Sequence, residues 1–136
     1  MERLKLRYQQ VRAALKSLEE PLEEISAAPN QRMHRIIRDS AIQRFEYTYE
    51  EFWKFLKEYL REFYGSEVET SKKIFREAQK ANLCNDEEVA HLLMMVDDRN
   101  KTSHQYDEAI IDEIFGRIKT YYDLMSDILE RIKTIE

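Results

Sequence analysis

The chain has 136 residues, of which 43% are hydrophobic and 36% charged, and its formal net charge is −5. This length fits one domain and is too short for two. With only two glycines and two prolines the chain has few places to turn, which favours a helical bundle over a sheet. The acidic balance argues against a protein whose main role is to hold nucleic acid by neutralising phosphates, but it leaves room for a local basic cleft.

Cysteine usage and hydropathy narrow the class further. Cys84 is the single cysteine, so it cannot form an intrachain disulfide, and its neighbours Asn85 and Asp86 carry no cation that would activate a thiolate. No stretch approaches the roughly 20 apolar residues of a membrane span, and the start of the chain reads as an amphipathic helix rather than a signal peptide. We therefore expect a cytoplasmic protein with no membrane contact.

Two long amphipathic helices are predicted in the first half. Apolar residues step by three and four over residues 4–25, and residues 27–30 (AAPN) have the composition of a helix end and a turn. The second helix is predicted over about residues 33–64. At about 1.5 Å per residue it is longer than a small domain needs, so we expect one end to project or the helix to break near residues 39–40.

This second helix carries a series of aromatic side chains that spread over more than one of its sides. They are Phe45, Tyr47, Tyr49, Phe52, Trp53, Phe55, Tyr59 and Phe63. Two interpretations stay open: all of them pack inside one bundle, or some of them form a subunit interface.

The second half has shorter elements with clear end signals. Gly65 is a natural helix C-cap, and Ser71 is expected to cap a short helix that ends near residue 82. Asn85 followed by Glu88 has the form of a capping box that opens the next helix. A last helix is expected to begin near Asp107, with apolar residues again stepping by three and four. The predicted fold is all-α, a single domain over residues 1–136 built as an antiparallel up-down bundle of three long and two short helices.

The segment 97–106 (DDRNKTSHQY) crowds polar and titratable side chains where the apolar rhythm stops. Arg99 and His104 would lie about 140° apart on a continuous helix, so a break is needed to bring them together. Thr102 and Ser103 have poor helix propensity, which makes such a break plausible. Arginine as a charge clamp and histidine as a proton shuttle supply what RNA cleavage needs without a metal, because RNA carries its own 2′-hydroxyl nucleophile.

Other interpretations of this segment stay open. In one, Arg99 pairs with Asp98 or Glu108 at a helix end and His104 is a cap. The only cluster that suggests a metal site is Asp97, Asp98 and His104, and neither His-x3-His nor Cys-x2-Cys occurs, so we expect no metal. The two glycines are isolated, which excludes a phosphate-binding glycine loop. The chain is therefore not itself a nucleotidyltransferase, and no cofactor is expected.

Three segments resemble a known family. Residues 99–107 (RNKTSHQYD) resemble the Arg-Asn-x-Thr-Ser-His-x-Tyr-Asp element of the HEPN-type nucleotidyltransferase substrate-binding family, which includes the HepT toxins with their Arg-x4-His-x-Tyr motif. Residues 39–50 (DSAIQRFEYTYE) resemble its Asp-Ser-x-Ile-Gln-Arg-Phe-Glu-Phe-Thr-x-Glu helix. Residues 74–78 (IFREA) resemble its Ile-Arg-Glu-Ala helix, with Lys72 in place of the usual proline. The three segments lie between residues 39 and 107.

The resemblance implies a helical homodimer encoded beside a minimal nucleotidyltransferase. Family members are either ribonuclease toxins or substrate-binding subunits of that transferase. In the toxins the motif residues, here Arg99 and His104, line a cleft at the dimer interface, and the transferase acts as antitoxin and adenylylates the motif tyrosine, here Tyr106. Negative charge on Tyr106 beside Arg99 would compete with an RNA phosphate.

The resulting hypothesis is a metal-independent endoribonuclease of a toxin–antitoxin pair, with Arg99 and His104 as catalytic residues. The predicted supporting or substrate-binding residues are Asn100, Ser103, Arg44 and Glu46. The competing interpretation is a non-catalytic subunit that binds a nucleotide or another substrate in the same cleft. A third is a scaffold whose aromatic helix face mediates assembly.

Overall fold

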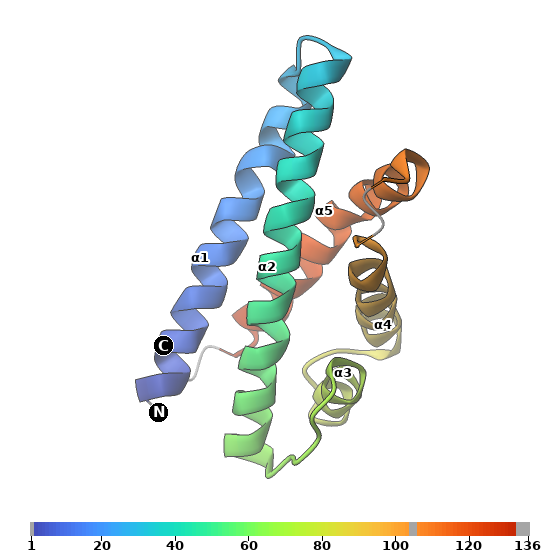
Figure 1. The fold of residues 1–136 in the computed structure, drawn as a ribbon. Helices are drawn as coiled ribbons and strands as arrows, with labels where there is room; N and C mark the ends of the chain where they lie inside the picture. The colour runs from blue at the N-terminus through green and yellow to red at the C-terminus, as the bar shows by residue number, and fades with distance from the viewer. Residues whose placement is uncertain (1, 104–105, 133–136) are drawn as a thin grey trace.

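The computed structural model describes residues 2–103 and 106–132, which form five α-helices and one 3₁₀ turn, with no strand among them (Figure 1). The α-helices are α1 (Glu2–Glu24), α2 (Gln31–Tyr64), α3 (Ser71–Lys80), α4 (Asp86–Lys101) and α5 (Glu108–Glu130), and the 3₁₀ turn η1 (Ile25–Ala27) follows α1. The predicted all-α class is confirmed, with three long helices and two shorter ones.

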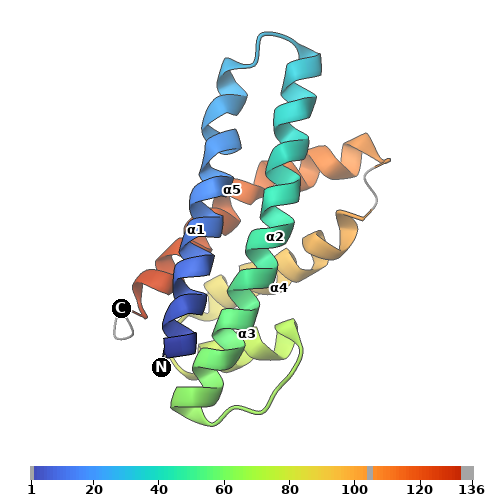
Figure 2. The same ribbon diagram turned by 60° about the vertical axis from the view of Figure 1, so that its left-hand side comes forward.

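The helices α1 and α2 form a long antiparallel hairpin that the other three pack against. Figures 1 and 2 show α5 crossing this pair at an angle, while α3 and α4 lie beside α2 on the side away from α1. The turn between α1 and α2 projects beyond the rest of the molecule. Of the two outcomes expected for the second helix, projection is the one observed, because α2 runs unbroken through residues 39–40.

Local signals set most helix ends. The Asn30 side chain accepts a hydrogen bond from the Met33 backbone N–H at 2.8 Å, and Gly65 ends α2 in the left-handed region with φ of 66°. The predicted capping box of Asn85 and Glu88 is present. One expectation is wrong: α3 begins at Ser71, so its N-cap is the preceding residue. The Ser71 hydroxyl instead accepts a hydrogen bond from a tyrosine of α2.

The core is one continuous cluster to which all five helices contribute. Most of the aromatic series on α2 lies inside it, and Phe45 stacks on Tyr121 of α5 with ring centroids 5.8 Å apart. Trp53 is partly buried and packs against the core, while Tyr47 and Phe63 have 55% and 45% of their surface exposed. The aromatic residues of α2 therefore build mainly the monomer core. None of the described helices has the length and apolarity needed to cross a membrane.

Candidate functional site

The last turn of α4 presents Arg99 to α2. The expected break falls at Thr102 and Ser103, because α4 remains helical through Lys101 and ends there. Met95, Asp98 and Thr102 are all buried, so the three-and-four step of the inward face continues with polar residues in place of apolar ones. The helix then ends at Thr102, whose backbone N–H bonds the carbonyl of Arg99 at 3.2 Å.

One edge of the Arg99 guanidinium is fixed by two partners. Its Nη1 lies 3.1 Å from Oε2 of Glu46 on α2 and 3.1 Å from the hydroxyl of Thr102, and that hydroxyl lies 2.5 Å from the same carboxylate oxygen. The side chains of Arg99 and Glu46 are 28% and 22% exposed. The alternative pairing of Arg99 with Asp98 or Glu108 is not formed.

The other edge of this guanidinium makes no hydrogen bond within the described part of the chain. Neither Nε nor Nη2 donates a hydrogen bond to a described residue, and Nε is buried without a partner. Buried donors are normally satisfied, so an orphaned one calls for an explanation. The Nε and Nη2 pair is a fork that matches two oxygens of a phosphate or a carboxylate.

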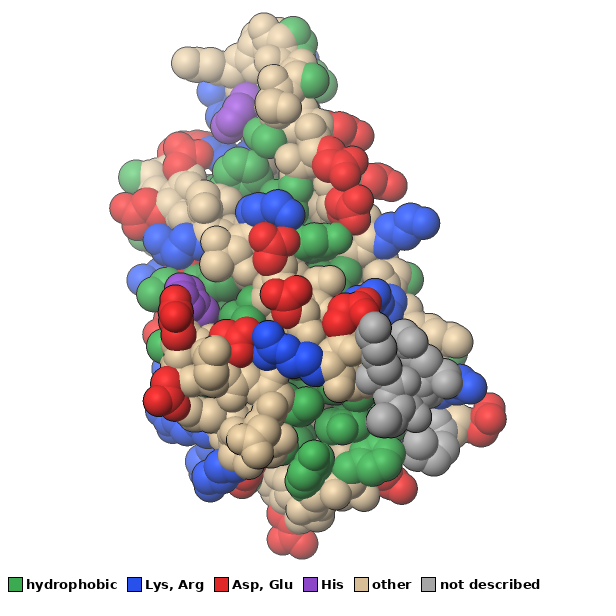
Figure 3. Space-filling view, turned by 180° about the vertical axis from the view of Figure 1, so that it is seen from behind, with side chains coloured by type: hydrophobic (Ala, Val, Ile, Leu, Met, Phe, Trp, Pro, Cys, Tyr) green, Lys and Arg blue, Asp and Glu red, His purple; other side chains and the backbone are tan. Residues whose placement is uncertain are grey.

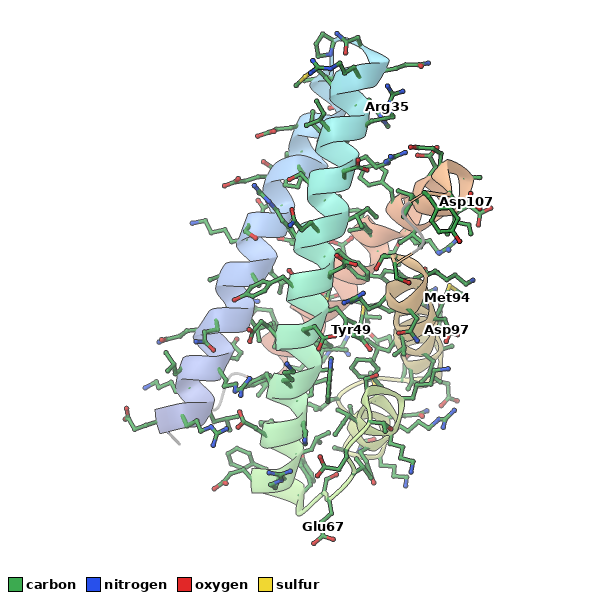
Figure 4. The ribbon with its side chains drawn as sticks, viewed as in Figure 1. Arg35, Tyr49, Glu67, Met94, Asp97 and Asp107 are labelled. Atoms are coloured by element: carbon green, nitrogen blue, oxygen red, sulfur yellow. The ribbon has the colours of Figure 1, made fainter. Side chains whose placement is uncertain are left out.

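Three helices meet beside this fork. The hydroxyl of Tyr49 on α2 donates to Oγ of Ser71 on α3 at 2.8 Å, and Lys72 Nζ lies 2.9 Å from Asp97 Oδ1 on α4. Figure 4 shows Tyr49 and Asp97 in the space between α2 and α4. Burial raises the pKa of Tyr49, and the nearby charge of Arg99 opposes that shift. Tyr49 is therefore a neutral hydroxyl within the electrostatic reach of Arg99.

Asp98, which precedes Arg99 on α4, holds this helix to α5. The Asp98 carboxylate is 2% exposed and accepts hydrogen bonds from Arg117 Nε at 2.7 Å, from Arg117 Nη2 at 2.9 Å and from the Tyr121 hydroxyl at 2.5 Å. Burial opposes ionisation of Asp98, but the hydrogen bonds from Arg117 and Tyr121 outweigh it and lower the pKa of Asp98. This buried ion pair fixes the turn of α4 that carries Arg99.

The remaining predicted residues are spread around the turn and α2. Asn100 and Ser103 are exposed, and the Ser103 hydroxyl donates to the Asn100 carbonyl at 3.0 Å. Arg44 does not reach Arg99; its Nη1 donates to the carbonyl of Ser17 on α1 at 2.6 Å. His104 lies outside the described residues. Tyr106 is described and is 83% exposed.

Sequence reasoning missed a buried cation outside this site. Arg38 on α2 is 3% exposed and is bound by Asp39 and, across the molecule, by Glu108 and Asp112 at the start of α5. It borders a groove of about 700 Å³ that is also lined by Gln31, His34, Arg35 and Phe115. Arg38 and Glu108 are far apart in the chain, so no spacing pattern links them. Burial disfavours the charged form of Arg38, yet its three carboxylate partners raise its pKa overall.

The two acidic residues near the C-terminal end of α4 are paired with cations. Asp97 pairs with Lys72 and Asp98 with Arg117. Within residues 2–103 and 106–132 no group of three His, Cys, Asp or Glu side chains is arranged to hold a metal ion. The open donors of the site are therefore those of Arg99, which suit an anionic ligand.

Comparison with known proteins gives one family model and several similar structures. Residues 6–134 match the model described as nucleotidyltransferase substrate binding protein like. A crystal structure of a protein from Thermus thermophilus is 41% identical with a TM-score of 0.80, covering 90% of this chain and 98% of that one. No curated protein matches the chain.

Two further solved structures are similar. HI0074 from Haemophilus influenzae, described as showing the fold of a substrate binding domain of a nucleotidyltransferase, is 26% identical with a TM-score of 0.82, covering 93% of this chain and 99% of that one. A tri-AMPylated Shewanella oneidensis HEPN toxin in complex with an MNT antitoxin is 17% identical with a TM-score of 0.76 and covers 98% of both chains. At that identity the last comparison concerns the fold alone.

Replacement of Asp98 by asparagine tests the ion pair between Asp98 and Arg117. We expect Asp98→Asn to lower the free energy of unfolding at pH 7 by about 2 kcal/mol, because the buried side chain loses its charge-assisted hydrogen bonds with Arg117 and Tyr121 while the part-exposed Arg117 stays hydrated. The folded-state pKa of Asp98 is lowered, so its contribution is present above the unfolded value of about 3.9 and is lost as pH falls through the folded value. Urea unfolding from pH 7 to pH 3 should show the gap between wild type and variant closing only below about pH 4.

The matched control is Asp97→Asn, which removes an exposed pair with Lys72 and should cost less than about 1 kcal/mol. A gap that stays constant down to pH 3, or equal losses in the two variants, would contradict the role assigned to Asp98.

Proposed function

Because the chain belongs to the nucleotidyltransferase substrate-binding protein family, we propose that it is a homodimeric partner of a minimal nucleotidyltransferase and that it cleaves RNA without a metal ion. The observation that carries the proposal is the half-satisfied guanidinium of Arg99, which is held by Glu46 and Thr102 on one side and has no hydrogen-bond acceptor among the described residues on the other. An RNA phosphate fits the open fork, and the fixed edge keeps the arginine in place as charge builds up on the phosphate.

In the proposed reaction, the 2′-oxygen of RNA forms a bond to phosphorus as the bond from phosphorus to the 5′-oxygen breaks. His104 takes the proton of the 2′-hydroxyl, and a proton returns from the imidazolium to the departing 5′-oxygen. Arg99 stabilises the negative charge on the phosphate oxygens. Glu46 acts as a positioning residue for Arg99, and the exposed Asn100 and Ser103 are placed to contact the substrate.

A second candidate function is supported by the family description itself. In this case the chain is the substrate-binding subunit of the transferase, and the Arg99 fork holds the phosphate of a nucleotide that is not cleaved. Arg99 has the same role in both candidates, since each places a phosphate on its open edge. They differ in whether His104 transfers a proton.

The proposed transferase partner would regulate the site through Tyr106. This tyrosine lies in the turn between α4 and α5 and is 83% exposed, so a second protein can reach its phenol. Transfer of AMP from ATP would join the phenol oxygen to the α-phosphorus and release pyrophosphate. The new phosphate would bring negative charge into the turn that begins three residues after Arg99, where it would compete with RNA.

The proposed homodimer would use the outward face of α2. Ile36 and Tyr47, 48% and 55% exposed, are eleven residues apart and lie within about 20° of each other around the helix. Tyr47 directly follows Glu46, so a partner subunit seated on this face would border the Arg99 fork. Two such sites would then face a shared cleft.

Cleavage of a single-stranded RNA in EDTA tests the reaction. We expect wild-type protein to cut it, Arg99→Gln to be slower by at least about a hundredfold through loss of charge stabilisation, and His104→Ala to be slower by a similar factor through loss of proton transfer. Arg12→Gln is the control, because Arg12 pairs with Glu130 away from the turn and its loss should leave the rate unchanged. Full activity of His104→Ala would exclude this mechanism. Nucleotide binding that depends on Arg99 without any cleavage would favour the second candidate.

The oligomeric state tests the α2 interface. Sedimentation equilibrium should give a mass of two chains for wild type, and Tyr47→Glu should raise the dissociation constant by at least about tenfold, because it places a charge in an apolar contact. Tyr64→Glu is the matched control, since Tyr64 is 56% exposed on the last turn of the same helix. A wild-type monomer across the accessible concentrations would exclude a shared cleft.

Intact-mass measurement tests the modification. Incubation with the partner transferase and ATP should add one or more AMP units to wild type and none to Tyr106→Phe, while Tyr47→Phe should still be modified. Modification should also slow RNA cleavage. An unmodified wild type would argue against regulation through Tyr106.

A further inference from the structure

The short helix α3 carries a concentration of positive charge that the proposed site does not use. In a chain of net charge −5, its ten residues hold four cations against one carboxylate, Glu77. At 100° per residue the four cations fall within about 100° of arc, opposite the side that is buried in the core. We call this surface the α3 basic face; it consists of Lys72, Lys73, Arg76 and Lys80.

Two of these cations are available to a ligand. Lys73 and Arg76 are exposed and make no ion pair with any residue that the structure describes. Lys80 has only a 3.9 Å contact with Glu77. Beside it, the Asp86 carboxylate accepts a hydrogen bond from the Gln79 side chain, so negative charge lies close to the C-terminal end of α3. The free charge is therefore concentrated on the first two turns of α3.

Those first turns adjoin the Arg99 fork. Ser71 bonds Tyr49, and Lys72 pairs with Asp97, two residues before Arg99 on the same helix. In Figure 1, α3 lies on the side of α2 away from α1. By contrast, acidic and basic side chains are interspersed over the face shown in Figure 3. The α3 basic face thus begins at the proposed site and extends beyond it.

We propose that the α3 basic face binds the sugar-phosphate backbone of the RNA strand whose reacting phosphate lies at Arg99. This inference rests on the proposed function, because a strand held at Arg99 brings a further phosphate with each nucleotide. Lys73, Arg76 and Lys80 are separated by about 4.5 and 6 Å along the helix axis, so the face presents charge at short intervals along a path. Contacts of this kind release counterions and carry no base specificity.

The test is a salt titration of RNA binding. All proteins carry His104→Ala so that the probe is not cut, and a fluorescein-labelled single-stranded RNA is followed by fluorescence anisotropy over a series of NaCl concentrations. Lys73→Gln/Arg76→Gln is compared with Lys5→Gln/Lys16→Gln. The control removes two exposed cations of α1 that have no ion pair among the described residues, so both double variants have the same net charge.

We expect the α3 variant to bind at least about tenfold more weakly than its parent at low salt, with the slope of log K against log salt reduced by about 1.4, which is two contacts at about 0.7 each. The α1 control should match the parent in both quantities. Equal behaviour of the two double variants, or no RNA binding by the parent, would overturn the proposal.

Two further comparisons separate this inference from the function on which it rests. Cleavage by Arg99→Gln in the protein that retains His104 reports on the Arg99 site alone. If Arg99→Gln abolishes cleavage but the α3 variant binds RNA as the control does, the α3 basic face is refuted and the Arg99 site is supported. If the α3 variant binds RNA normally but loses its association with the transferase, the face contacts a protein and the RNA assignment is wrong.

Discussion

The ion pair between Asp98 and Arg117 is the constraint on which the geometry of the site depends. A carboxylate that is almost fully buried is stable only when its partners satisfy it, and here Arg117 and Tyr121 do so from one side of α5. Asp98 and Arg99 are adjacent, so they point about 100° apart around α4. With Asp98 committed to α5, Arg99 is directed to α2, where Glu46 receives it.

This arrangement explains how an acidic chain can offer a site for an anion. The carboxylates nearest Arg99 are engaged: Asp98 by Arg117, Asp97 by Lys72, and Glu46 by Arg99 itself. Each of these carboxylates has a cation partner, whereas the Nε and Nη2 donors of Arg99 have no hydrogen-bond acceptor among the described residues. The net charge of a whole chain therefore says little about the field at one turn, which is set by the pairing of its neighbours.

Much of the fold follows from local rules that a sequence displays. Caps such as Asn85 with Glu88 act within one turn, and the three-and-four apolar step marks each helix, so these features could be predicted. The polar segment points to Arg99 and the family resemblance to Glu46, and the structure brings the two into contact. The extent of α4 could not be predicted from apolar spacing, because Asp98 and Thr102 occupy inward positions as polar residues. The partners of Arg38 lie about seventy residues away, and only the tertiary fold brings them together.

The part-exposed Arg117 and the buried Arg38 have a joint consequence for the turn between α4 and α5. Arg117 holds the helix that enters the turn, and Arg38 holds the first residues of the helix that leaves it. Ion pairs therefore hold both helices that flank this turn, and closing such a short loop costs little chain entropy. A group attached to this turn would alter the charge and the space beside Arg99 while α4 and α5 keep their positions.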